Sequence, residues 1–205
     1  LSKENLEQAS EVADRIFPDE HVSPSESFEA SLDERKKSEY KNKVPHIEDL
    51  RYWVAKEYAK VLGTVGLYTQ EADKEEAHWL GWFCVAPEAR GRGVGTALLE
   101  HAISEARKAG VPLLRLYTSD HPDEETAQLL YEKRGFKITR KDKSGSDSGG
   151  KILYRELDLT GEGEVPCEET KEPVLSCHQV TIRKAIEEKL SPKHADESEI
   201  GRAHV

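Results

Sequence analysis

A glycine-rich turn holds the residues of this sequence that are best suited to chemistry. Residues 90–96 read RGRGVGT and stand between an apolar run that ends at Val85 and a stretch with helical periodicity. The first backbone N–H groups of a helix have no partner within it, and the helix dipole favours negative charge there. Glycine lets the backbone approach a phosphate closely, since it has no Cβ. The turn therefore predicts a phosphate site at the start of a helix.

Two common phosphate-binding motifs do not fit this turn. The P-loop requires a lysine directly after its last glycine, and none follows here. The dinucleotide fingerprint is G-x-G-x-x-G, whereas these glycines run G-x-G-x-G. What fits is Arg-x-x-Gly-x-Gly, with Arg90, Gly93 and Gly95, after a strand that Pro87 ends. Taken alone, the motif leaves open a turn that only joins a strand to a helix.

A second block of residues follows downstream. Residues 113–118 are apolar and strand-like, and residues 124–134 form a predicted helix. The helix and the two residues after it carry A-x-x-L-Y-x-x-x-G-F, with markers at Ala127, Leu130, Tyr131, Gly135 and Phe136. The two blocks, in this order, resemble the GCN5-related N-acetyltransferase (GNAT) superfamily. The resemblance covers roughly residues 50–159.

The resemblance implies acetyl-CoA as the acyl donor. The backbone of residues 91–96 would bind its pyrophosphate, with Arg90 and Arg92 adding positive charge. The backbone of residues 83–85 would pair with the pantetheine arm like an added strand. The implied acetyl-CoA-binding residues are Phe83, Cys84, Val85, Arg90, Gly91, Arg92, Gly93, Val94, Gly95 and Thr96. In the superfamily a bulge splays this strand, and Gly81 and Cys84 are the two candidates to mark it.

Tyr131 stands where the superfamily often places its general acid. A phenol with a pKa near ~10 keeps its proton at neutral pH and can give it to a departing thiolate. The alternative is a helix tyrosine whose hydroxyl lies in water. Glu124 departs from the pattern, because many relatives have asparagine there and a carboxylate does not donate to pantetheine. Glu76, His78 and Asp120 are candidate bases near strand ends, but the sequence singles out none.

The predicted fold is α/β (α+β), a mixed, mostly antiparallel sheet flanked by helices, as in GNAT proteins. Apolar spacing predicts an amphipathic helix from Leu6 to Phe17, and a second helix is predicted from Phe28 to Tyr40. The predicted strands are 52–55, 61–68, 78–85, 113–118, 137–139 and 151–159, and a helix with its apolar face from Val94 to Ile103 follows the glycine turn.

Composition excludes several classes of function. The chain has 205 residues, 36% hydrophobic and 34% charged, with a formal net charge of −10, which argues against a nucleic-acid partner. No apolar run approaches the ~20 residues of a membrane span. Three irregularly spaced cysteines and no secretory signal predict a cytoplasmic protein without a disulfide framework. The scattered residues Cys167, Cys177, His178 and His194 lack metal-site spacing, so no metal is predicted.

The predicted domains are residues 1–159 as the GNAT domain, 160–179 as an acidic linker and 180–205 as an extension. Residues 180–185, VTIRKA, resemble the x-I-R-x-A strand that opens GNAT domains. We expect this segment to pair beside Tyr52–Ala55 and complete the sheet, as in a circular permutation or a strand exchanged in a homodimer. The alternatives are the start of a second domain and a surface helix from Ala185 to Leu190.

The function implied by the resemblance is N-acetyl transfer from acetyl-CoA directly to a primary amine on a small molecule or peptide. Acidic residues between 19 and 34 would favour a cationic acceptor, although a solvated surface explains them equally well. The alternative function is a catalytically weak CoA-binding sensor or interaction module.

Overall fold

The computed structural model describes residues 1–18, 20–143 and 150–161. The helices and strands follow one another in the order α1 (Leu6–Ile16), α2 (Pro24–Leu32), α3 (Glu34–Lys43), β1 (Ile47–Glu57), β2 (Lys60–Gln70), β3 (Ala77–Val85), α4 (Val94–Ala109), β4 (Leu113–Ser119), α5 (Glu125–Lys133), β5 (Lys137–Lys143) and β6 (Lys151–Asp158), with short 3-10 turns at Pro87–Ala89 (η1) and Pro122–Glu124 (η2). Every strand predicted from the sequence is present, most of them longer than expected.

The strands form one six-stranded sheet in the order β1-β2-β3-β4-β6-β5. Neighbours are antiparallel except for β3 and β4, which run parallel. The sheet is therefore mixed and mostly antiparallel, and the predicted fold class is confirmed.

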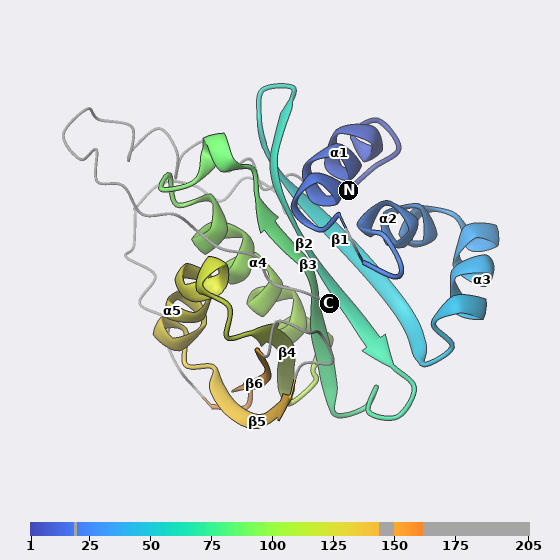
Figure 1. The fold of residues 1–205 in the computed structure, drawn as a ribbon. Coiled ribbons are helices and arrows are strands. Elements are labelled where there is room, and N and C mark those ends of the chain that lie inside the picture. The colour runs from blue at the N-terminus through green and yellow to red at the C-terminus, as the bar shows by residue number, and fades with distance from the viewer. Residues whose placement is uncertain (19, 144–149, 162–205) are drawn as a thin grey trace, which may run out of the picture.

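Helices cover both faces of the sheet (Figure 1). α1, α2 and α3 lie on one face, where α1 packs on β2 and β3, and α2 packs on β1. α4 and α5 lie on the other face, with α4 across β1 to β4. Each face has its own apolar core, because side chains of a strand point alternately to its two sides.

The prediction of a single helix from Phe28 to Tyr40 was wrong. The structure has two helices that meet at Asp33, whose extended backbone ends α2 and whose carboxylate accepts hydrogen bonds from the N–H groups of Arg35 and Lys36 to start α3. An aspartate bound in this way caps a new helix, which favours a break over a continuous helix.

The edge of β1 that faces away from β2 is the place predicted for residues 180–185. These residues, and most of the predicted linker, lie outside the described part of the chain. In that part, the Leu1 amino group donates a hydrogen bond of 3.0 Å to the Tyr52 carbonyl on β1. No helix among the described residues is long and apolar enough to cross a membrane.

Candidate active site

The parallel strands β3 and β4 separate along their length. Their pairing includes Ala77, His78 and Trp79 on β3, opposite residues 113–115 on β4. Beyond Trp79 the described strands share no further pairs, although β3 still pairs with β2 and β4 with β6. The facing edges of residues 80–85 and 116–119 therefore carry backbone groups that an extended ligand can pair with.

A bulge in β3 lies beside this opening. Trp82 has a positive φ of 39°, and the pairing register with β2 shifts between Gly81 and Cys84. The Thr64 hydroxyl donates a 2.6 Å hydrogen bond to the Trp82 carbonyl and so holds the bulge in place. The bulge thus lies between Gly81 and Cys84, the two candidates from the sequence, and Trp82 has its irregular backbone angle. A positive φ is uncommon for a tryptophan, so its residue type gave no indication of this position.

The glycine-rich turn lies between η1, which follows β3, and the start of α4, so it precedes a helix as predicted. Gly91 and Gly93 have φ values of 72° and 79°, a region open to glycine at little cost. Gly93 is the N-cap of α4, where no side chain caps the helix and the first turn carries no acidic residue. The N–H groups of this first turn are therefore available to an anion, with the helix dipole oriented favourably.

The two arginines of the turn make different contacts. Arg92 pairs with Glu57 at the end of β1, with 2.6 Å between Nη2 and Oε1. Arg90 donates from Nε to the Val85 carbonyl at 3.4 Å. Both guanidinium groups lie at the turn, but Arg92 is already held by a carboxylate. The backbone of the turn is therefore a stronger candidate than Arg92 for holding an anion.

Tyr131 lies under the opening, on the α5 face of the sheet. Its side chain is 0% exposed, and its ring centroid lies 6.1 Å from that of Phe83 on β3 and 5.7 Å from that of Phe136. Among the described residues, no group makes a hydrogen bond with the Tyr131 hydroxyl. Burial raises the pKa of Tyr131 well above its ordinary value, and the charge of Glu124 raises it further. The alternative of a hydroxyl in water is excluded.

A buried hydroxyl without a partner costs on the order of 1–3 kcal/mol. Such a group is unusual in a folded protein and suggests that its partner is a ligand. The Tyr131 hydroxyl, the free strand edges and the uncapped start of α4 together fit an extended ligand with a phosphate at one end.

Cys84 is a buried thiol on β3. Burial raises its pKa to about 11, although a contact with the Thr64 hydroxyl 3.3 Å away works in the opposite direction. Because the thiolate is the reactive form, this cysteine is a poor nucleophile at neutral pH. Its place in the site comes from its backbone, on a strand edge that borders the opening.

The three candidate bases are dispersed. Glu76 and His78 lie at the paired end of β3, away from the opening, and Glu76 is bonded to Arg115. Burial lowers the pKa of His78, and the charge of Arg51 lowers it further. Asp120 follows the open end of β4, where its carboxylate accepts from the N–H of Lys151 at 2.7 Å. No cluster of three or more potential metal ligands occurs in the described ranges.

The other face of the opening carries aromatic and charged side chains that sequence analysis did not single out. Alternation along β4 buries Leu116 and Thr118 and turns Arg115 and Tyr117 to the α1–α3 face. Burial raises the pKa of Tyr117, and so does the charge of Glu20, which follows α1. The alternation of apolar and polar residues along 113–119 could have shown that Arg115 and Tyr117 share this face.

The same face is rich in carboxylates. Arg115 forms ion pairs with Asp73 at 2.7 Å, Glu76 at 3.2 Å and Glu156 at 2.9 Å. Three carboxylates around one guanidinium leave a negative balance at the paired end of β3 and β4, two residues along β4 from Tyr117.

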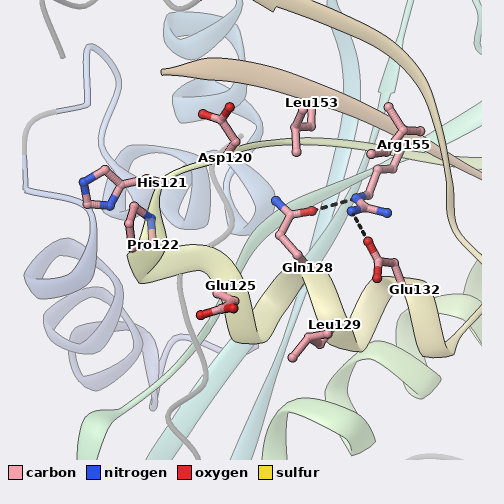
Figure 2. Close-up of a pocket in the computed structure, with 10 residues that line it drawn as sticks. Asp120, His121, Pro122, Glu125, Gln128, Leu129, Glu132, Leu153 and Arg155 are labelled. Atoms are coloured by element: carbon pink, nitrogen blue, oxygen red, sulfur yellow. Dashed lines mark hydrogen bonds and ion pairs between the residues drawn. The ribbon is translucent and has the colours of Figure 1, made fainter. Parts of the chain in front are cut away.

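A groove of about 510 Å³ lies on the opposite side of α5 (Figure 2). Its lining includes the candidate base Asp120, but neither Tyr131 nor any residue of the glycine-rich turn. Gln128 and Glu132 line it, and both bind the buried guanidinium of Arg155, as the dashed lines show. The full lining is Asp120, His121, Pro122, Glu125, Gln128, Leu129, Glu132, Ile138, Leu153 and Arg155.

Comparison with known proteins agrees with this geometry. Residues 48–138 match the acetyltransferase (GNAT) domain family. This stretch of the chain, from β1 into β5, is thus similar to a GNAT domain. A segment of 55 residues is 42% identical to GCN5-related N-acetyltransferase 6, chloroplastic, of Arabidopsis thaliana, and this match spans 27% of the chain but only 18% of that protein.

Solved structures share the GNAT fold. The ribosomal-protein-S18-alanine N-acetyltransferase of Escherichia coli superposes with a TM-score of 0.58 at 21% identity, over 80% of this chain and 94% of that one. An aminoglycoside 6'-N-acetyltransferase complexed with coenzyme A gives 0.55 at 16% identity, over 76% and 91% of the two chains. At these identities the likeness concerns the fold alone.

Proposed function

We propose that this chain transfers the acetyl group of acetyl-CoA directly to a primary amine. The observation that carries the proposal is the buried, unpartnered hydroxyl of Tyr131 beside the opening between β3 and β4. Support also comes from the uncapped start of α4 and from a fold shared with an acetyltransferase that was solved with coenzyme A.

The donor would lie along the opening. The backbone of residues 91–96 would hold its pyrophosphate, and the free edge of residues 83–85 would pair with its pantetheine arm. This arrangement directs the thioester toward the bulge at Trp82 and the Tyr131 hydroxyl.

The acceptor's neutral nitrogen would attack the thioester carbonyl from the α1–α3 face. A C–N bond forms, and the C–S bond breaks with its electron pair on sulfur. Tyr131 gives its proton to that sulfur and regains one from solvent, while the nitrogen loses its extra proton to water or a base. Such general acid help is typically worth ~10²- to 10⁴-fold in rate.

The proposed acceptor is a cationic amine. The carboxylates around Arg115 and the Glu20 charge beside Tyr117 favour a second positive group on the acceptor. Attraction between opposite charges raises the local concentration of such a ligand and weakens as salt is added.

A turnover assay tests this proposal. The full chain would be mixed with acetyl-CoA and either a diamine or an uncharged primary amine of equal length, while free thiol and the acetylated product are measured. We expect turnover with both and a lower KM for the diamine, and we expect this preference to shrink at high salt. Tight acetyl-CoA binding without turnover on any amine would favour a CoA-binding sensor.

A further inference from the structure

Glu124 occupies an unusual place for a carboxylate. It closes the turn between β4 and α5, serves as the N-cap position of α5 and is only 2% exposed. Its two oxygens accept hydrogen bonds from the hydroxyl of Thr118, from the Ser119 N–H at 3.0 Å and from the Ser119 hydroxyl at 2.6 Å. Glu124 thus ties the open end of β4 to the start of the helix that carries Tyr131.

The same helix is tied to the sheet one turn further on. Gln128 donates to the Thr118 hydroxyl at 3.2 Å and to the Ser119 carbonyl at 2.7 Å, and accepts from Arg155 Nε at 2.7 Å. Figure 2 shows Gln128 and Arg155 facing one another below β6. A connected set of hydrogen bonds therefore runs from Glu124 through β4 to β6, and it fixes the position of α5 over the sheet.

Tyr131 packs against apolar rings and lies within reach of two charges. Phe83 and Phe136 flank its ring. Burial is the main cause of the raised pKa of Tyr131; Glu124 adds to it, and Arg155 opposes it. Removing the charge of Glu124 while Arg155 remains would therefore lower the pKa of Tyr131.

We propose that Glu124 is a positioning residue for acetyl transfer, which holds α5 against the open end of β4 and so fixes the Tyr131 hydroxyl at the reacting sulfur. This inference rests on the proposed function, since it assigns Glu124 a role that acts through Tyr131. Glu124 itself is not expected to touch the donor, because its oxygens are taken by Thr118 and Ser119.

A double-mutant cycle tests the proposal in the full chain. The variants are Glu124→Gln, Tyr131→Phe and their combination, and Glu125→Gln serves as the matched control because that neighbouring carboxylate is exposed. The measurements are kcat against pH with acetyl-CoA and a diamine, and the acetyl-CoA Kd by calorimetry. If Glu124→Gln does not fold, Thr118→Val takes its place in the cycle with Tyr131→Phe, because it removes one hydrogen-bond donor to Glu124.

We expect Glu124→Gln to lower kcat on the order of tenfold, within the range of coupled neighbours, with the acetyl-CoA Kd unchanged. The alkaline limb of its kcat profile should move to lower pH, and the change should have no further effect once Tyr131 is Phe. Independent, multiplicative losses in the double variant, or a profile equal to that of Glu125→Gln, would overturn the inference alone. A parent chain without turnover would overturn the proposed function and this inference with it.

Discussion

Tyr131 and Cys84 are both buried beside the opening, yet burial affects their chemistry in opposite ways. It keeps the phenol protonated, which a general acid requires, and it keeps the thiol protonated, which a nucleophile cannot use. The residue types alone do not separate these roles. This pair supports the proposed direct transfer to the amine, without an acyl-enzyme on Cys84.

The raised pKa of Cys84 predicts a pH effect on stability. The unfolded thiol ionises near its ordinary pKa of 9.0 and the folded thiol near 11, so the unfolded state loses its proton first. Stability is therefore complete below about pH 9 and falls as pH rises toward 11. A shift of about two pKa units corresponds to at most roughly 3 kcal/mol.

Cys84→Ala isolates this contribution from that of the buried tyrosines. Chemical unfolding of both proteins at pH 8 and pH 10.5 should show a smaller loss of stability for Cys84→Ala. Equal losses in the two proteins would show that the thiol does not titrate as its burial implies.

At the scale of elements, the turn between β3 and α4 makes the sharpest prediction. Gly93→Val places a branched side chain at a φ of 79° and over the uncapped helix start. We expect acetyl-CoA to bind at least about tenfold more weakly, a difference of roughly 1.4 kcal/mol, by calorimetry.

Gly110→Val is the matched control for this change. Gly110 ends the same helix with a φ of 80°, and a Cβ there would meet nothing within 4 Å. Both variants carry the same backbone strain, so both should lose stability, but only Gly93→Val should lose binding. Equal acetyl-CoA affinities in the two variants would remove the turn from the donor site.

The sequence predicted the order of strands and helices because their periodicities are strong and local. It missed the break at Asp33 between α2 and α3. It also missed the start of α2, although the capping box of Ser23 and Glu26 was present as Ser-x-x-Glu. It also could not place the bulge, because that depends on how β3 meets Thr64 on β2. The same distinction between local patterns and distant contacts holds for the candidate site. The glycine-rich turn and Tyr131 belong to local motifs and could be predicted. Tyr117 and the hydrogen bonds of Glu124 could not, because they depend on contacts between separate elements.

At the scale of the whole molecule, the edge of β1 that no described strand covers remains the basis of one sequence prediction. Exposed sheet edges are usually covered, and residues 180–185 stay our candidate strand for this one. The bond from Leu1 to the Tyr52 carbonyl already uses part of this edge, so the pairing would have to begin beyond Tyr52.

Deleting residues 162–205 checks this pairing. If the segment completes the sheet, the shortened chain should melt several degrees lower, because a loss of 1 kcal/mol lowers Tm by roughly 2–4 °C in a domain of this size. An unchanged Tm would place residues 180–185 outside the sheet. If the Tm does fall, size-exclusion chromatography of the full chain distinguishes the two routes. A monomer would mean that the strand comes from the same chain, and a dimer would fit a strand exchanged between two chains.

The most direct test of acetyl transfer by this site is the single-turnover rate of Tyr131→Phe at saturating acetyl-CoA, with Tyr58→Phe on the exposed β1–β2 turn as the control. Loss of the proton donor should slow thiol release by ~10²- to 10⁴-fold. The acetyl-CoA Kd should change little, and Tyr58→Phe should behave like the parent. If Tyr131→Phe released thiol at the parent rate while chemistry limits that rate, Tyr131 would not be the general acid and the proposed mechanism would be wrong.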